Sequence, residues 1–130
     1  MASPALRHMA TIAGNIGNAS PAGDTLPILY ALDAIIVLQS VKGIRELPIN
    51  EVITGPRRHV INQNEIIKEI KIPISVFTNS VFEKVGGRKA DAISKVSFTG
   101  AVNIKDGKVL DFRIAFGAVS ATILRRKELE

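Results

Sequence analysis

Hydrophobic and polar residues alternate most regularly in the last third of the chain, where the pattern predicts a β-hairpin. One face of an incoming strand is apolar at Val96, Phe98, Val102 and Ile104. One face of an outgoing strand is apolar at Leu110, Phe112, Ile114 and Phe116. Between the two strands, Asp106-Gly107 readily adopts the positive φ angles of a type I′ turn.

Alternation also predicts strands over 65–73, where Pro73 would end the strand, and over 81–85. Together with the hairpin they indicate an antiparallel sheet. Its apolar face needs a cover, and the charged tail 117–130 is too short to supply one. We expect the cover to lie outside this chain or on a neighbouring chain, which leaves room for self-association.

The first half of the chain has a different pattern. Small residues and glycines dominate 10–23, which favours a strand followed by a loop. The apolar segment 26–32 predicts a buried helix with Asp24 as its N-cap. The β-branched run 34–38 predicts a buried strand.

Shorter segments follow, and the composition changes near residue 62. We interpret them as a connection over 45–48, a helical turn over 49–53 capped by Asn50, and turns over 55–59 and 62–64. The sequence therefore predicts an α+β protein with a domain boundary between 1–61 and 62–130.

Composition narrows the classes of function. Of 130 residues, 46% are hydrophobic and 22% charged, as in folded globular domains. No apolar run reaches the roughly 20 residues of a membrane helix, so we expect no membrane insertion. The lack of cysteine excludes disulfides, thiolate metal sites and a cysteine nucleophile, and fits a cytoplasmic protein. The net charge of +5 favours an anionic partner: nucleic acid, a phosphate-bearing cofactor or an acidic subunit.

The basic residues form clusters over 57–59 and 125–127. A nucleic-acid surface usually places aromatic residues among basic ones, but this chain has one tyrosine and no tryptophan. We therefore expect no nucleic-acid partner and interpret both clusters as solvated turn and tail charges. His8 and His59 lie far apart in sequence, so we predict neither a metal site nor a catalytic triad, and no catalytic residue.

The segment 11–24 carries the clearest candidate chemistry. Its glycines allow close approach of a ligand, and its other side chains offer neutral hydrogen-bonding groups: Thr11, Asn15, Asn18 and Ser20. The free N–H groups of the helix that follows would point toward this segment. These features suit a nucleotide.

Two standard phosphate-binding motifs are excluded. Gly23 is followed by Asp24 rather than by Lys-Ser/Thr, and only Gly14-x-x-Gly17 of a dinucleotide fingerprint is present. A carboxylate at Asp24 would also repel a phosphate seated on the helix end. Asp24 would accept hydrogen bonds from ribose or ribityl hydroxyls, or would only cap the helix.

Segments 10–16 and 19–24 resemble the second flavin-binding motif of the FAD subunits of molybdenum hydroxylases, a group that includes xanthine dehydrogenase and the medium subunit of carbon monoxide dehydrogenase. Ala13 departs from that motif, which usually has glycine there. The similarity continues through Gly55-Pro56, 65–73, Phe82-x-Lys84-x-x-x-Arg88 and 116–119.

The resemblance implies a set of FAD-binding residues: Ala10, Thr11, Gly14, Asn15, Gly17, Ser20, Asp24, Ile66, Ile67 and Lys84. Within this set, Ile66 and Ile67 would pack near the isoalloxazine ring, and Lys84 would reach its polar edge. An ammonium there would stabilise anionic reduced flavin. The alternative for Lys84 is an exposed strand lysine.

The resemblance also implies the fold: the second lobe of a two-lobed FAD-binding domain, followed by the antiparallel sheet of a C-terminal domain, both incomplete. Members of the family begin with another lobe, whose glycine-rich loop holds the pyrophosphate. We therefore expect this chain to be an internal piece that alone binds FAD more weakly than micromolar.

By the same resemblance, FAD would pass electrons from iron–sulfur clusters to NAD or another acceptor in a xanthine dehydrogenase-like enzyme. The molybdenum cofactor and the iron–sulfur clusters would lie in partner subunits. The alternative is a non-catalytic module that uses its sheet face for subunit interaction.

Overall fold

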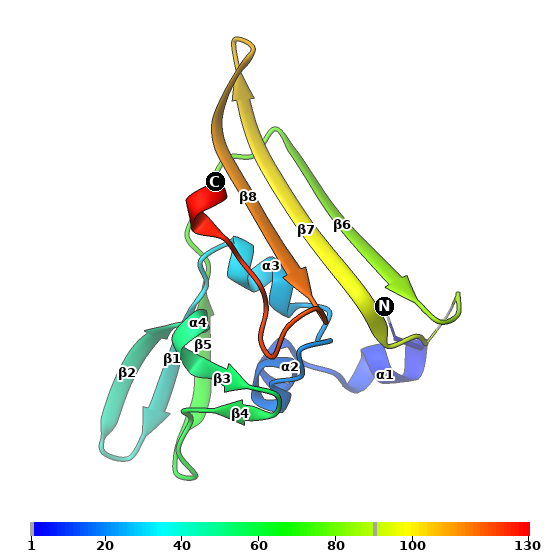
Figure 1. Ribbon diagram of the computed structural model, residues 1–130. Helices are drawn as coiled ribbons and strands as arrows, with labels where there is room; N and C mark the ends of the chain where they lie inside the picture. The colour runs from blue at the N-terminus through cyan, green and yellow to red at the C-terminus, as the bar shows by residue number, and fades with distance from the viewer. Residues whose placement is uncertain (1, 90) are drawn as a thin grey trace.

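The computed structural model describes residues 2–89 and 91–130 and shows a mixed helix and sheet fold with antiparallel sheets (Figure 1). Its helices are α1 (Pro4–Met9), α2 (Ile12–Asn18), α3 (Leu26–Ala31), α4 (Ile49–Val52) and a 3-10 helix (Lys127–Leu129). Its strands are β1 (Ile35–Ser40), β2 (Gly43–Pro48), β3 (Ile53–Gly55), β4 (Arg58–His59), β5 (Ile66–Lys71), β6 (Asn79–Gly86), β7 (Ser94–Lys105) and β8 (Lys108–Gly117). In the described part of the chain no helix is long and apolar enough to cross a membrane.

β1 is the central strand of a sheet with the order β2-β1-β5, which confirms the predicted buried strand. The strand predicted over 65–73 is present as β5, but its expected place in the sheet of the hairpin is wrong. Ile70 lies opposite Ile36 of β1, and Ile67 lies opposite Leu38. Because alternation shows that a strand has one apolar face but not which strand it pairs with, the sequence did not identify this neighbour.

The sequence predicted a connection over 45–48, and this is wrong. The segment is part of β2. Its charged residues are accommodated in the strand because each has an ion-pair partner in β5 or directly before it. Arg45 pairs with Glu65 at 2.7 Å, and Glu46 pairs with Lys71.

The Arg45–Glu65 pair predicts a pH dependence. Hydrogen bonds from Arg45 and from the backbone of Asn62 lower the pKa of Glu65 from 4.5 to about 2. Since the folded pKa lies below the unfolded one, the stabilisation is present above pH 4.5 and is lost as the pH falls toward 2. In the wild-type chain, the urea concentration at the unfolding midpoint should fall as the pH decreases through this range. We expect this decrease to be smaller in Glu65→Gln and to be unchanged in Glu51→Gln, a substitution in α4. Equal slopes in all three proteins would contradict this prediction.

The predicted hairpin is confirmed. β7 and β8 pair in antiparallel fashion through a two-residue turn in which φ is 51° at Asp106 and 72° at Gly107. The strand predicted over 81–85 is β6, which completes a sheet with the order β6-β7-β8.

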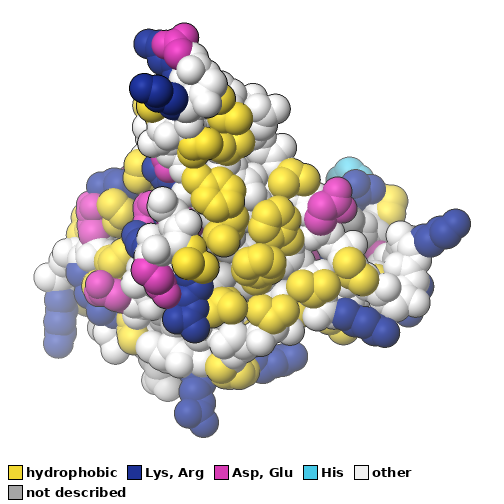
Figure 2. All heavy atoms as spheres, turned by 45° about the horizontal axis from the view of Figure 1, so that its top comes forward, with side chains coloured by type: hydrophobic (Ala, Val, Ile, Leu, Met, Phe, Trp, Pro, Cys, Tyr) yellow, Lys and Arg dark blue, Asp and Glu magenta, His cyan; other side chains and the backbone are white. Residues whose placement is uncertain are grey.

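The two faces of this sheet have different residues and different surroundings. α3 packs against β7 and β8, and the side chains buried on that face are small: Ser97, Thr99, Ala101 and Ala115. The opposite face carries the large apolar side chains and has a groove of about 370 Å³ lined by Val81, Phe98, Val102 and Phe112. Figure 2 shows hydrophobic side chains gathered along the sheet below the tip of the hairpin. The chain itself therefore covers the small-residue face, and the apolar face is open.

The sequence predicted a strand followed by a loop over 10–23, and this is wrong. The segment contains the helix α2. The helix forms despite its glycines because both of its ends are stabilised. Thr11 caps the N-terminus, and Ala19 ends the helix in the left-handed conformation with φ of 45°. Ile16 and Ala19 are fully buried, so packing adds to the caps.

The helical turn predicted over 49–53 is α4, but Asn50 is not its cap. The helix begins at Ile49, and Pro48, two residues before Asn50, occupies the N-cap position. The predicted turn over 55–59 is confirmed as the connection between β3 and β4, and its residues Arg57, Arg58 and His59 are exposed.

A single cluster of buried apolar side chains joins α2, α3, α4, the β2-β1-β5 sheet, β8 and the tail. Its members include Ile16, Leu26, Leu29, Ile36, Leu38, Ile49, Val52, Ala115 and Ile123. Residues from both sides of the predicted boundary between 61 and 62 thus share one core. In Figure 1, α2 and α3 lie between the two larger sheets.

Tyr30 contributes an unusual polar atom to this core. Its side chain is 5% exposed, and its hydroxyl has no hydrogen-bond partner in the described part of the chain. Burial raises the pKa of Tyr30 to about 12. Because an unpartnered buried hydroxyl costs about 1–3 kcal/mol, we expect Tyr30→Phe to leave the free energy of unfolding unchanged or raise it by up to about 1 kcal/mol. Urea unfolding tests this, with Tyr30→Leu as a destabilising control; destabilisation by Tyr30→Phe would overturn it.

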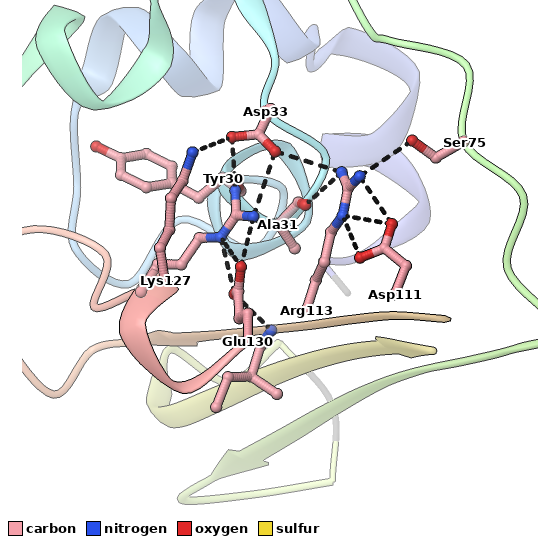
Figure 3. A network of polar contacts seen from close by, with 10 residues as sticks. Tyr30, Ala31, Asp33, Ser75, Asp111, Arg113, Lys127 and Glu130 are labelled. Atoms are coloured by element: carbon pink, nitrogen blue, oxygen red, sulfur yellow. Dashed lines mark hydrogen bonds and ion pairs between the residues drawn. The ribbon is translucent and has the colours of Figure 1, made fainter. Parts of the chain in front are cut away.

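Arg125 is not the solvated tail charge that the sequence predicted, because its side chain is only 8% exposed, whereas Lys127 is exposed as expected but is also ion-paired. The carboxylate of Asp33, just after α3, accepts from Lys127 at 2.6 Å, from Arg125 at 2.9 Å and from Arg113 of β8 at 3.3 Å (Figure 3). Arg125 also pairs with Glu130 at 2.8 Å. Burial acts to raise the pKa of Asp33, but the bonds from Lys127 and Arg125 hold it below its ordinary value. The tail is therefore fixed to α3 and β8 by this network.

Candidate functional site

α2 occupies the segment in which the sequence predicted a nucleotide-binding motif. Thr11 Oγ1 accepts from the N–H of Gly14 at 2.9 Å, and Asn15 Oδ1 accepts from the hydroxyl of Thr25 at 2.6 Å. A Cβ at Gly17 would meet no described atom within 4 Å. A ligand can therefore approach the backbone of α2 at that point.

Two further candidate residues lie at the ends of α2. Ala10 is exposed between α1 and α2, and its N–H donates to the carbonyl of Leu6. Ser20 follows α2, and its Oγ accepts from the N–H of Ala22 at 3.3 Å. The hydroxyl hydrogen of Ser20 remains a donor for a ligand.

The candidate residues Asp24 and Lys84 contact each other although they lie 60 positions apart in sequence. Lys84 Nζ donates to Asp24 Oδ2 at 2.7 Å, and Ser94 Oγ donates to Asp24 Oδ1 at 3.0 Å. The side chains of Lys84 and Asp24 are only 18% and 14% exposed. The ion pair thus connects the segment before α3 to β6 and β7.

The prediction that Asp24 caps α3 is wrong. Thr25 is the N-cap residue, and in the described residues no side chain donates or accepts a capping bond there. The carboxylate of Asp24 faces Lys84 and Ser94 instead, because these two donors satisfy its partly buried charge. Lys84 is likewise not an exposed strand lysine. The positive charge of Lys84 balances the negative charge of Asp24. The pair therefore repels a nearby phosphate less than the carboxylate alone would.

Ile66 and Ile67 lie apart from this cluster. Both belong to β5 in the sheet of β1, whereas Lys84 is on β6 in the other sheet (Figure 1). Ile66 is exposed, and Ile67 packs against the hydrophobic core. The structure therefore brings Asp24 and Lys84 together with the segment of α2 but not with the two isoleucines.

Sequence reasoning missed two residues of the cluster, Thr25 and Ser94. Thr25 stands beside Asp24, and its position directly after the motif segment is a signal that could have identified it. Ser94 carries no such signal, because its contact depends on a shift in pairing between β6 and β7 at Val85 and Gly86.

The residues of this region fit a nucleotide cofactor such as FAD. Neutral donors and acceptors lie along α2, the face at Gly17 is open, and the charge of Asp24 is balanced by Lys84. Such a set can hold sugar hydroxyls and approach a pyrophosphate through backbone N–H groups. Within residues 2–89 and 91–130 no group of three His, Asp or Glu side chains is arranged to hold a metal ion.

The sequence comparison identifies the class. Residues 1–75 match the family model described as the FAD binding domain in molybdopterin dehydrogenase. Because this match covers more than half of the chain, the chain belongs to that family, the FAD-binding domains of molybdenum hydroxylases. The resemblance stated from the motifs is thereby confirmed, and FAD is the cofactor of the family.

Two relatives show the same relationship over most of the chain. The chain is 33% identical over 126 residues to the glyceraldehyde dehydrogenase medium chain of Sulfolobus acidocaldarius. That match covers 96% of this chain and 44% of the relative. It is 35% identical over 111 residues to the nicotinate dehydrogenase FAD-subunit of Eubacterium barkeri. That match covers 82% of this chain and 38% of the relative. The chain therefore spans less than half the length of these relatives.

A solved structure supports the fold. Carbon monoxide dehydrogenase from Hydrogenophaga pseudoflava, in a form that lacks the Mo-pyranopterin moiety of the molybdenum cofactor, superposes with a TM-score of 0.88 at 28% identity. The match covers 96% of this chain and 44% of that chain.

Proposed function

We propose that the chain binds FAD and acts as the electron-transfer component of a molybdenum hydroxylase. The observation that carries this proposal is the contact between Asp24, at the end of the motif segment, and Lys84 of β6, at 2.7 Å. Motif residues and a strand lysine from distant parts of the sequence thus meet in one partly buried cluster. Such a cluster is expected where several segments surround a cofactor.

The proposed roles follow from the chemistry of each group. The backbone around Ala10, Thr11, Gly14 and Gly17 would lie along the cofactor, with Asn15 and Ser20 beside its polar groups. Asp24 would accept from ribityl hydroxyls, and Lys84 would supply positive charge at the polar edge of the ring. Bound FAD would supply the electron chemistry, while these residues bind and orient it. Ile66 and Ile67 would contribute apolar surface if the ring extends toward β5.

The wider proposal concerns the whole enzyme. Electrons would arrive from iron–sulfur clusters, with these clusters and the molybdenum cofactor in partner subunits, and would leave to NAD or another acceptor in the cytoplasm. The named relatives are subunits of a glyceraldehyde dehydrogenase and a nicotinate dehydrogenase, so a xanthine-type substrate is one alternative among several. We also propose that the chain has two lobes. Because the family match ends at residue 75 and β5 pairs with β1, we place the division after β5 rather than between residues 61 and 62.

Titration of the chain with FAD, followed by quenching of flavin fluorescence, tests this function. We expect saturable binding with a dissociation constant above about 1 μM. Lys84→Met should weaken it about tenfold, whereas Lys42→Met, an exposed lysine in the turn of the other sheet, should leave it unchanged. Absence of saturable binding up to about 1 mM FAD would contradict the proposal.

The open apolar face of the β6-β7-β8 sheet favours a second role, in subunit interaction. This role is compatible with flavin binding because the two surfaces lie on opposite faces of β6. Val81 lies opposite Gly100 on the apolar face, and Lys84 lies opposite the buried Ser97. The family match supports flavin binding as the primary function.

A further inference from the structure

Ser94 is a buried residue with a specific polar contact that neither the sequence motif nor the family match indicates. It is the first residue of β7 and is 6% exposed. Its hydroxyl donates to Asp24 Oδ1 at 3.0 Å, while Lys84 Nζ donates to the other oxygen, Oδ2, at 2.7 Å. Each oxygen of the carboxylate therefore has its own donor, and the two donors come from neighbouring strands.

Burial alone does not explain this contact. Ser97 lies three residues further along β7 and is 1% exposed, but its hydroxyl has no partner in the described part of the chain. Ser94 differs because the pairing of β6 with β7 shifts between Val85 and Gly86, which places Ser94 opposite Gly86. The irregular pairing thus brings one of two buried serine hydroxyls to Asp24.

We propose that Ser94 is a positioning residue of the flavin site, which holds Oδ1 of Asp24 and so directs Oδ2 to Lys84. Two donors on different oxygens prevent the carboxylate from turning about its side-chain axis, and this fixes the ammonium of Lys84 as well. Thr25 binds Asn15, so the same arrangement fixes the motif segment to the sheet. The consequence for FAD depends on the proposed function; the effect on the Asp24–Lys84 pair does not.

The first experiment needs no flavin. A double-mutant cycle with Asp24→Asn and Lys84→Met, measured by urea unfolding, gives the coupling between the two side chains. We expect Ser94→Ala to reduce this coupling by at least half and Ser94→Thr, which keeps the hydroxyl, to restore it. Ser97→Ala is the matched control and should leave the coupling unchanged. An undiminished coupling in Ser94→Ala would overturn the proposal.

The second experiment measures FAD affinity in the same variants by flavin fluorescence. We expect Ser94→Ala to weaken binding about three- to tenfold, with Ser94→Thr and Ser97→Ala within about twofold of wild type. If Ser94→Ala and Ser97→Ala weaken binding equally, Ser94 has only a packing role and the proposal fails. If wild-type chain binds no FAD while the coupling still depends on Ser94, the proposed function fails and the positioning of Asp24 stands.

Discussion

Gly117→Ala is expected to lower the free energy of unfolding by about 1–3 kcal/mol, a large effect for the addition of one methyl group. Gly117 ends β8 where α3 packs against the sheet. A Cβ at this position would overlap with Ser97 Oγ, and it would lie 3.0 Å from Pro27 Cγ and 3.4 Å from the carbonyl oxygen of Pro21. These neighbours surround the position, so the methyl group can be accommodated only if Ser97 Oγ, Pro27 and the backbone at Pro21 shift from their packed positions.

Two further variants test this explanation by urea unfolding. Gly55→Ala in β3 is the control, because its nearest described neighbour would be at 3.8 Å, and we expect a change within about 0.5 kcal/mol. The double variant Ser97→Ala with Gly117→Ala removes the closest atom and should recover part of the loss. If Gly117→Ala costs as much in the Ser97→Ala background as in the wild-type background, contact with Ser97 is not the cause of the loss.

The second prediction concerns cofactor affinity: Asp24→Ala should weaken FAD binding about 10- to 100-fold. The substitution removes the acceptor proposed for ribityl hydroxyls. It also leaves Lys84 partly buried without its counter-charge, which releases the ammonium from its position. The measurement is the dissociation constant for FAD from fluorescence titration of the folded variant.

Asp33→Asn is the matched control for this experiment. Asp33 also carries ion pairs, with Arg113, Arg125 and Lys127, but it belongs to the network that fixes the tail. We expect Asp33→Asn to reduce stability and to leave FAD affinity unchanged. If Asp24→Ala behaves like Asp33→Asn, Asp24 serves only the fold.

The elements that the sequence predicted well are those specified by local interactions. The hairpin follows from alternation and from Asp106-Gly107, both of which are contained within 96–116. α2 was missed because its glycines disfavour a helix by composition, while the cap bond at Thr11 and the burial of Ile16 outweigh that preference. The outcome of such a competition depends on packing, which local sequence does not contain.

The sequence motif predicted which residues belong to the candidate site. It did not predict how those residues contact one another. The resemblance named Asp24 and Lys84 separately, but their contact depends on how β6 approaches the segment before α3. Ser94 depends further on the shift in pairing between β6 and β7. Similarly, β5 was predicted as a strand, and its pairing with β1 was not, since pairing over a long sequence separation is not encoded in alternation.

The network at Asp33 also affects how the chain folds. It joins Asp33 to Lys127, 94 residues apart in sequence, and Ala115 and Ile123 complete the core that begins at Ile16. Contacts of such sequence separation carry a large loop-closure entropy, and proteins rich in them fold over milliseconds to seconds. On the ribosome, the core would stay open until the residues of β8 and the tail have emerged. We therefore expect the two sheets to become stable together, in one late cooperative step.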